Sequence, residues 1–339
     1  MNPRAHEVKV VDVVAETADA VTITFDIPPD VDDRFRYAPG QFVTVRVPSE
    51  RTGSVARCYS LCSSPHSDER LAVTVKRTPS GYASNWLCDN VVEGAVLTVL
   101  EPAGTFVPRS LDRDMLLCAA GSGITPVMSI ATSMVCAGTG DVALLYANRD
   151  PDSVIFARRL AAFGSALTVQ HWLESERGLP SVAGLAELLE PYRDRDTYLC
   201  GPAGFMTTTR AALANLGVPE RRIVQEQYRS LDDNPFETPR PAVTGSGGGT
   251  TLEVEIDGQT HTFAWPRNKK LLDVLLDAGI DAPYVCRESA CATCVCSVRD
   301  GRTRMIMNES LIDEEIDAGL TLACQTLPES ERVRIAFDQ

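Results

Sequence analysis

The stretch CRESACATC, residues 286–294, has the most informative spacing in this 339-residue chain. It leaves four residues between Cys286 and Cys291, two between Cys291 and Cys294, and 29 between Cys294 and Cys324. One tight loop then supplies three thiolates to a small bound object, and a distant segment supplies the fourth. The residues between the loop cysteines are small enough for such a loop: Ser289, Ala290, Ala292 and Thr293.

This spacing is that of a plant-type [2Fe–2S] cluster. The alternatives are four buried structural cysteines or a zinc site. Zinc sites usually pair two C-x2-C segments, and the sequence holds no second such pair near this one. We therefore predict that the metal ligands are Cys286, Cys291, Cys294 and Cys324. We expect Cys296 to be a core thiol of the following strand.

The segments before the cysteines predict a small α+β ferredoxin domain of the β-grasp type over residues 251–339. Two alternating runs in LEVEIDGQTHTFAWP, residues 252–266, flank Asp257 and Gly258, a strong hairpin signal. KKLLDVLLDAG, residues 269–279, has the pattern of an amphipathic helix. Residues 232–250 are rich in Pro, Gly and Ser and predict a linker.

The rest of the chain predicts two further domains. Residues 1–107 contain short Val- and Thr-rich runs broken by Pro and Gly, which predict an antiparallel β-barrel or a β-sandwich, and we expect the barrel. Residues 108–231 alternate apolar strands with helical patterns, which predict a parallel α/β sheet. The expected strands of the two domains are 8–14, 20–26, 42–47, 71–77, 95–100, 141–149, 167–173 and 197–202, and the expected helices include 181–192 and 205–217.

The composition excludes several classes of protein. Hydrophobic residues make up 44% of the chain and charged residues 23%, as in soluble globular proteins. No apolar run reaches the roughly 18 residues of a membrane span, and the first ten residues do not resemble a secretory signal. We therefore expect a cytoplasmic protein without a membrane partner. The net charge of -14 argues against nucleic-acid binding, because phosphate contacts need Lys and Arg.

The whole chain resembles the flavin- and [2Fe–2S]-containing oxygenase reductases of the ferredoxin–NADP reductase superfamily. Within that family it is most similar to the reductase components of 3-ketosteroid 9α-hydroxylases. The resemblance is carried by RCYSLCSSP, AVTVKRTPSGYASNWL, LCAAGSGITPVMSI, LLYANRDPDSVIF, TYLCGPAGFM and APYVCRESACATC. One departure is that the family's cluster loop usually has glycine where this chain has Ser289 and Ala292. A positive φ at either position would be strained.

The resemblance implies a flavin site in two segments of the barrel. In the first, Arg57 can pair with phosphate, Tyr59 can stack on the flavin ring and Ser60 can donate to its reactive nitrogen. In the second, Lys76 and Gly81 precede a helix expected over 84–91, with Ser84 as its N-cap, and a helix N-terminus binds anions. The first segment alone fits an ordinary barrel turn better than a flavin site. Together with the family match, the helix amides favour FAD over FMN.

The resemblance also implies a pyridine-nucleotide site. The turn GSGITP places amides of Gly121 and Gly123 at the start of a helix, where they can face a pyrophosphate, with Thr125 and Pro126 in its first turn. This turn lacks the third glycine of the dinucleotide fingerprint, so the family match carries the assignment. Asp150 after the second strand favours NADH, because it would repel a 2′-phosphate, whereas Arg149 argues for NADPH.

The resemblance places Cys200 beside the nicotinamide ring, with Gly201 and Pro202 shaping the turn. Near the end of the same domain, we expect Glu226 to assist hydride transfer and Tyr228 to cover the ring. The alternative for this last segment is a plain final strand. The predicted catalytic residues are therefore Ser60, Cys200 and Glu226.

Together these sites predict a converter of two-electron to one-electron transfer, from NADH to FAD to [2Fe–2S] to an external acceptor. The resemblance implies that the acceptor is a Rieske-type, non-haem iron oxygenase component acting in steroid degradation. We expect the reductase to be a monomer.

Residues 251–339 hold 16 acidic and 9 basic residues, so this domain is suited to steer onto a basic protein patch. The acidic residues between the third and fourth ligands are Glu309, Asp313, Glu314, Glu315 and Asp317. The alternative for this segment is an ordinary solvated helix.

Two other functions stay open on the sequence. The chain fits a reductase for an aromatic-ring, phenylacetyl-CoA or cytochrome P450 oxygenase, because no residue pattern identifies the partner. It also fits a non-enzymatic redox sensor whose cluster state controls binding to a partner, although a sensor would not need a hydride site.

Overall fold

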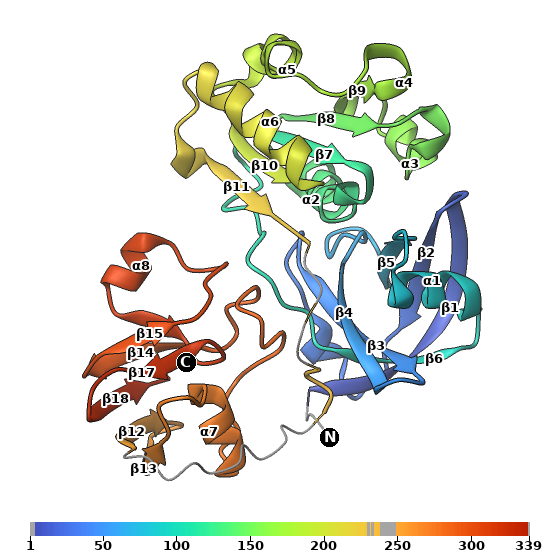
Figure 1. The fold of residues 1–339 in the computed structure, drawn as a ribbon. Helices are drawn as coiled ribbons and strands as arrows, with labels where there is room; N and C mark the ends of the chain where they lie inside the picture. The colour runs from blue at the N-terminus through green and yellow to red at the C-terminus, as the bar shows by residue number, and fades with distance from the viewer. Residues whose placement is uncertain (1–3, 229–230, 232–233, 238–248, 338–339) are drawn as a thin grey trace. The chain divides into compact units, whose positions relative to one another are not determined.

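The computed structural model describes residues 4–228, 231, 234–237 and 249–337 (Figure 1). It divides into two compact units, one with the two N-terminal sheets and one with the C-terminal sheets. Most of the predicted linker, residues 232–250, lies outside the described residues. The domain boundaries at 107 and 231 stay predictions.

The N-terminal sheet has six strands in the order β4-β3-β6-β1-β2-β5. Its ends meet at an antiparallel bridge between Leu61 and Val73, which closes the sheet into a barrel. Valines in alternation, such as Val43, Val45 and Val47 in β3, fill the interior. The elements are β1 Ala5–Thr17, β2 Ala20–Asp26, η1 Asp32–Phe35, β3 Phe42–Ser49, β4 Gly53–Ser60, β5 Leu71–Lys76, α1 Tyr82–Asn90 and β6 Val96–Leu100.

The second sheet is parallel, with the strand order β11-β10-β7-β8-β9. Its strands are β7 Met115–Ala120, β8 Val142–Asn148, β9 Thr168–Leu173, β10 Asp196–Cys200 and β11 Ile223–Glu226. Its helices are α2 Ile124–Ala137, α3 Ala157–Ala162, α4 Glu174–Arg177, α5 Val182–Leu189 and α6 Ala203–Asn215. The short 3-10 turns are η2 Gly121–Gly123, η3 Pro151–Ser153, η4 Gly164–Ala166, η5 Glu190–Tyr192 and η6 Glu220–Arg222.

Both faces of this sheet are covered, which explains why its strands read as continuous apolar runs. Every residue of β7 is buried. Leu117 packs in a core with Ile130 of α2, whereas its neighbour Leu116 packs in a core with Leu213 of α6. The chain leaves β7 toward β8 and returns to the opposite side at β10, so the strand order reverses between β7 and β10. In open α/β sheets, ligands bind at such a reversal, at the carboxyl ends of the strands.

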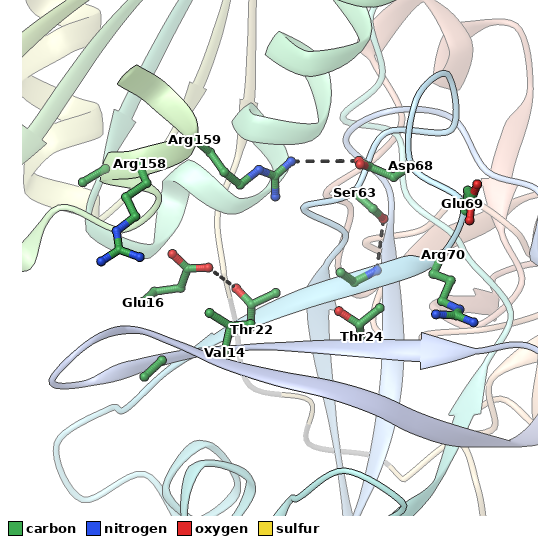
Figure 2. A pocket seen from close by; sticks show the side chains of 13 residues that line it. Val14, Glu16, Thr22, Thr24, Ser63, Asp68, Glu69, Arg70, Arg158 and Arg159 are labelled. Carbon is green, nitrogen blue, oxygen red and sulfur yellow. Dashed lines mark hydrogen bonds and ion pairs between the residues drawn. The ribbon is translucent and has the colours of Figure 1, made fainter. Parts of the chain in front are cut away.

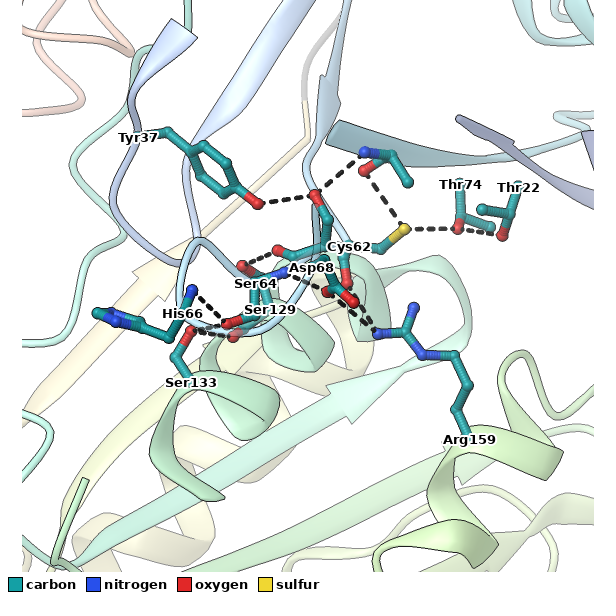
Figure 3. Close-up of polar contacts among 12 residues, drawn as sticks. Thr22, Tyr37, Cys62, Ser64, His66, Asp68, Thr74, Ser129, Ser133 and Arg159 are labelled. Carbon is teal, nitrogen blue, oxygen red and sulfur yellow. Dashed lines mark hydrogen bonds and ion pairs between the residues drawn. The ribbon is translucent and has the colours of Figure 1, made fainter. Parts of the chain in front are cut away.

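Polar contacts fix the loop after β4 of the barrel onto α2 and α3 of the second sheet (Figure 3). The Ser129 hydroxyl donates to the Ser63 carbonyl at 2.6 Å, and the hydroxyls of Ser64 and Ser133 are 2.8 Å apart. Arg159 of α3 donates to the Cys62 carbonyl at 3.4 Å. Because these bonds are largely buried, they hold the end of β4 at a defined place beside the parallel sheet.

The C-terminal unit has a five-stranded sheet in the order β13-β12-β18-β14-β16 and a two-stranded sheet of β15 and β17. Asp257 and Gly258 both have positive φ, at 50° and 72°, which is the turn that the hairpin prediction requires. The elements are β12 Thr250–Ile256, β13 Gln259–Trp265, α7 Leu271–Asp277, β14 Val295–Asp300, β15 Thr303–Met305, α8 Asp313–Asp317, β16 Leu320–Leu322, β17 Thr326–Pro328 and β18 Arg332–Ala336.

The core of this unit forms around Trp265, which is fully buried and donates its indole N–H to the Lys269 carbonyl at 2.7 Å. Cys296 lies in β14 and is 2% exposed, so its prediction as a core thiol is confirmed. The barrel, the parallel α/β sheet and the α+β domain thus confirm the predicted fold class. Among the described residues, no helix combines the length and apolarity needed to cross a membrane.

Candidate functional site

Residues from the barrel and from the parallel sheet meet at Ser60. This serine ends β4 and is buried, and its hydroxyl is hydrogen-bonded to Glu226 Oε2 at 3.3 Å and to the Tyr228 hydroxyl at 3.2 Å. Glu226 ends β11, and the Tyr228 hydroxyl also lies 3.3 Å from the Ser122 carbonyl in the glycine turn after β7. The structure therefore brings together residues separated by more than 160 positions in the chain, as the resemblance implies.

Cys200 completes this constellation at the carboxyl end of β10. Its side chain is fully buried and hydrogen-bonds to Tyr228. Burial, and then the negative charge of Glu226, raise the pKa of the Cys200 thiol well above its usual value. The thiol is therefore neutral, and its place is the strand-order reversal where ligands bind.

Glu226 has an unusual protonation behaviour for a carboxyl group. Burial raises its pKa from 4.5 to about 8, although the hydrogen bond from Ser60 acts in the opposite direction. The side chain is thus a neutral acid at pH 7. A neutral carboxyl donates a hydrogen bond, so Glu226 can donate to the Ser60 oxygen and leave the serine proton free for another acceptor.

The glycine turn after β7 fits a close approach of backbone and ligand. Gly121 has φ +53° and open space where a side chain would lie. A Cβ on Gly123 would lie 2.2 Å from the Cys200 carbonyl oxygen, so only glycine allows this turn to pack on β10. A Cβ on Gly201 would similarly crowd Phe205 and Ala120, at 3.0 and 3.1 Å.

Two of the residues predicted to bind the nucleotide at this turn have buried side chains. Thr125 is 2% exposed and its hydroxyl donates to the Ser122 carbonyl at 2.9 Å, and Pro126 is buried in the first turn of α2. Both stabilise the turn rather than reach out of it. Pro202 is exposed and precedes α6, where it serves as the N-cap residue.

Lys76 lies beside the glycine turn, 3.9 Å from the position that a Gly121 Cβ would take. Its ammonium group is 3.7 Å from the Asp19 carboxylate, which also accepts a hydrogen bond from Arg149 at 3.2 Å. Asp19 therefore joins a cation of the barrel to a cation of the parallel sheet. Sequence reasoning missed Asp19, because nothing in its local sequence links it to two partners that distant.

Asp150, whose charge favours NADH in the sequence, also holds the loop after β8. Its carboxylate accepts from the Ser153 amide at 2.8 Å and the Ser153 hydroxyl at 2.7 Å, and so caps η3. Asn148, two residues earlier, ends β8, is 5% exposed and hydrogen-bonds to the Tyr146 side chain.

The two predicted flavin segments lie in β4 and at the start of α1, and the structure corrects one detail of them. Tyr59 is partly buried in β4, and burial raises the pKa of its hydroxyl. Helix α1 begins at Tyr82 rather than at residue 84, with Gly81 as its N-cap. The prediction of Ser84 as the N-cap is therefore wrong, because its hydroxyl accepts the Thr78 amide at 3.1 Å inside the preceding turn.

The N-terminus of α1 fits a phosphate. Its N-cap residue, Gly81, has no side chain with which to accept the first amides of the helix. Gly81 itself is required, since a Cβ there would lie 2.8 Å from Thr78 Cβ and 3.0 Å from Ser84 Oγ. Arg57 lies in β4, where its guanidinium donates to the Ala56 carbonyl at 2.6 Å. These groups fit a flavin that carries phosphate.

A separate cavity of about 610 Å³ lies between the barrel strands and α3. Figure 2 shows its charged lining, which includes Glu16, Asp68, Arg158 and Arg159. Glu16 accepts from Thr22 at 2.8 Å, and Arg159 lies 3.9 Å from Asp68, so much of this charge is paired within the wall. The lining includes none of the predicted site residues, so the cavity is distinct from the Ser60 constellation.

The four predicted cluster ligands converge in the C-terminal unit. All are buried, with exposed fractions of 1% for Cys286, 6% for Cys291 and 2% for both Cys294 and Cys324. They form two hydrogen-bonded thiol pairs, Cys286 with Cys291 and Cys294 with Cys324. This pairing fits a cluster of two irons, each held by two thiolates.

The cluster loop has an unusual backbone. Arg287, Ser289 and Ala292 have φ of 61°, 60° and 53°, a left-handed conformation that non-glycine residues seldom adopt. The strain anticipated at Ser289 and Ala292 is therefore present, and Arg287 adds a third strained position. Each such residue costs about 1 kcal/mol or more, so the surrounding contacts must hold the loop.

Several hydrogen bonds provide that support. Arg287 is 7% exposed and forms an ion pair with Asp273 of α7. Gln325 Nε2 donates to the Arg287 carbonyl at 2.8 Å and contacts Cys324 Sγ at 3.6 Å. The Glu288 amide donates to Cys286 Sγ at 3.3 Å. Amide donors around the thiols fit a sulfur-ligated cluster, whose charge they stabilise.

Comparison with known families agrees with this arrangement. Residues 7–107 match the family described as an oxidoreductase FAD-binding domain, and residues 117–211 match an oxidoreductase NAD-binding domain. Residues 254–329 match a 2Fe-2S iron-sulfur cluster binding domain. The predicted cofactors FAD, NADH and [2Fe–2S] are confirmed by these matches.

Similar proteins extend over nearly the whole chain. The ferredoxin reductase component of 3-ketosteroid-9-alpha-monooxygenase from Mycobacterium tuberculosis (strain CDC 1551 / Oshkosh) is 54% identical, over 98% of this chain and 96% of that protein. A component of 1,2-phenylacetyl-CoA epoxidase from Escherichia coli (strain K12) is 32% identical, over 98% of both chains. The solved structure of phthalate dioxygenase reductase covers 98% of both chains with a TM-score of 0.56 and 23% identity, and shares the fold.

Proposed function

Because this chain belongs to the flavin- and [2Fe–2S]-containing oxygenase reductases, we propose that it is the reductase component of a 3-ketosteroid 9α-hydroxylase. It is an NADH-dependent oxidoreductase that supplies a terminal oxygenase with electrons. Its acceptor in this proposal is a Rieske-type, non-haem iron component. The observation that carries the redox function is the meeting of Ser60, Glu226 and Cys200 at one point.

The bound FAD supplies hydride acceptance and single-electron release, and the chain supplies position and proton control. Glu226 is a neutral acid, as its pKa of about 8 allows, and it can donate a hydrogen bond to the Ser60 oxygen. The Ser60 O–H is then free to donate to another acceptor. Tyr228 is 45% exposed, so its ring can cover one face of the site, while its hydroxyl is fixed by Ser60. The neutral thiol of Cys200 forms a small, uncharged wall next to the glycine turn.

NADH rather than NADPH is supported by the charge arrangement around Asp19. Two cations, Arg149 after β8 and Lys76 beside the glycine turn, both face this carboxylate at 3.2 and 3.7 Å. A 2′-phosphate would have to compete with Asp19 for them.

The docking surface for the oxygenase lies, in this proposal, around α8. Asp313, Glu314 and Asp317 are exposed on this helix, and Ile306 and Ile312 beside it are 52% and 59% exposed. An acidic rim around exposed apolar residues suits a basic protein partner.

This surface is directly connected to a cluster ligand. The Ile306 amide donates to the Gln325 carbonyl at 2.9 Å, and Gln325 follows Cys324. The connection provides a short exit for electrons. We extend the proposal to a monomeric protein that works in the cytoplasm.

The test is reconstitution of the purified reductase, loaded with FAD and cluster, with candidate oxygenases. NADH consumption coupled to 9α-hydroxylation of a 3-ketosteroid is expected with a 3-ketosteroid 9α-hydroxylase oxygenase component. Coupled turnover with a phenylacetyl-CoA epoxidase and none with the ketosteroid enzyme would contradict the proposed partner. Absence of NADH oxidation with every acceptor would contradict the redox function and favour a sensor.

A further inference from the structure

Ser289 lies inside the cluster loop with its polar atom unused. The residue is 1% exposed, and its Oγ has no hydrogen-bond partner among the described residues. Buried hydroxyl groups in native proteins nearly always have a partner, so an orphaned one calls for an explanation. A group bound at this place would supply the missing acceptor.

The backbone of Ser289 has a conformation that favours glycine. Ser289 has φ +60°, where glycine would be free of strain and any other residue is not. Serine therefore costs stability twice, through its conformation and through its unpaired hydroxyl. Both costs are explained if the hydroxyl has a function in the loaded protein.

The backbone of Ser289 contacts a ligand sulfur. The Ser289 backbone amide hydrogen-bonds to the Cys324 sulfur, and Gln325 Nε2 contacts the same sulfur at 3.6 Å. In sequence, Ser289 lies between Cys286 and Cys291, which pair with each other. The residue therefore contacts the distant fourth ligand and lies between two of the loop ligands in the sequence.

We propose that the Ser289 hydroxyl donates a hydrogen bond to a sulfur atom of the bound [2Fe–2S] cluster and raises its reduction potential. A donor stabilises the reduced form more, because that form carries one more negative charge. Ser289 is thus a positioning and tuning residue rather than a ligand. The inference rests on the cluster site of the proposed function and adds a determinant of its potential.

The experiment measures the cluster potential in the full-length protein loaded with FAD and cluster, by redox titration followed with low-temperature EPR. Ser289→Ala removes the hydroxyl and keeps the strained backbone, whereas Ser289→Gly removes both. Both variants should have a lower potential than the wild type, with up to a tenfold change in the electron-transfer equilibrium constant, or about 59 mV. Ala292→Gly, which relieves strain without removing a hydroxyl, should leave the potential unchanged.

The outcomes separate this inference from the proposed function. A wild type without a reduced-cluster signal would overturn both. A wild type with a normal signal, and Ser289→Ala with the same potential, would overturn the inference alone. Where Ser289→Ala does not assemble a cluster, Ser289→Thr, which keeps the hydroxyl, should retain the wild-type potential while Ser289→Gly lowers it. Equal potentials in these two variants would overturn the inference as well.

Discussion

The Ser60 constellation and the cluster loop are built in opposite ways. Ser60, Cys200 and Glu226 come from three strands spread over 166 residues of sequence and meet through tertiary packing. Three of the four cluster ligands come from nine consecutive residues, and the loop's own backbone positions them. The first site relies on unstrained strand ends, and the second on three non-glycine residues with positive φ.

This difference explains what each site tolerates. The Ser60 constellation holds a desolvated carboxyl group that is neutral at pH 7. Deprotonation of Glu226 would place an anion in this site and destabilise it. The cluster loop holds strain, so its weak point is conformation, and its stability depends on clamps such as Arg287 with Asp273 and Gln325. Damage to one site should therefore leave the other measurable.

The largest expected effect comes from removing a cluster ligand. Cys294→Ser should abolish the reduced-cluster EPR signal and lower oxygenase-coupled turnover by about 100-fold or more, because one iron loses a thiolate. NADH oxidation with ferricyanide should persist, since the hydride site is intact. The matched control is Cys296→Ser, two residues away in β14 and not a ligand, which should keep the cluster. Loss of the ferricyanide reaction in Cys294→Ser would show that the two sites are not separable.

The second-largest effect is expected from a change in the Ser60 constellation that leaves the cluster intact. Ser60→Ala should slow flavin reduction by NADH about 100-fold, because a donor at the reacting centre is lost. The cluster, reduced directly with dithionite, should give an unchanged EPR signal. Stopped-flow absorbance of the flavin measures the rate. A rate within about a factor of two of the wild type would remove Ser60 from the catalytic residues, since a lost donor costs far more.

Glu226 should make stability depend on pH. The pKa of Glu226 in the folded protein is about 8, above the usual 4.5. Its stabilising contribution to the free energy of unfolding is therefore complete below about pH 4.5 and is lost as the pH rises towards 8. The Tm of the wild type should therefore fall by about 5 °C relative to Glu226→Gln between about pH 5.5 and 8.5. Thermal unfolding of the flavin-loaded proteins measures this, and parallel pH profiles would refute the raised pKa.

The smallest effect concerns loop strain. Ala292→Gly should stabilise the cluster-loaded domain by about 1 kcal/mol, because glycine adopts φ 53° without strain. Ala290→Gly is the matched control, since Ala290 is exposed and has no positive φ, and it should be neutral or destabilising. Denaturant unfolding measures both. Equal losses of stability would mean that the loop stores no strain at Ala292.

Local patterns were sufficient to predict features that depend on neighbouring residues. The spacing of Cys286, Cys291 and Cys294 predicts the cluster loop, and Asp257-Gly258 predicts the hairpin. The assembly of Ser60 with Glu226 was expected only through the family resemblance, since no local pattern encodes a contact over 166 positions.

The details that sequence reasoning missed depend on competition between partners. Asp150 caps η3, and Ser84 bonds inside a turn instead of capping α1. Asp19 and Gln325 were not anticipated, because their roles arise from neighbours brought by other strands. In each case several acceptors and donors were available, and only the packing decides among them.

Anaerobic titration with NADH asks whether the two sites form one relay. Flavin absorbance and the low-temperature EPR of the cluster are followed in the same sample. If electrons pass from the first site to the second, NADH should bleach the flavin and produce a rhombic reduced [2Fe–2S] signal. Flavin bleaching with no cluster signal, in protein whose cluster dithionite does reduce, would contradict the relay, because electrons would then stop at the first site.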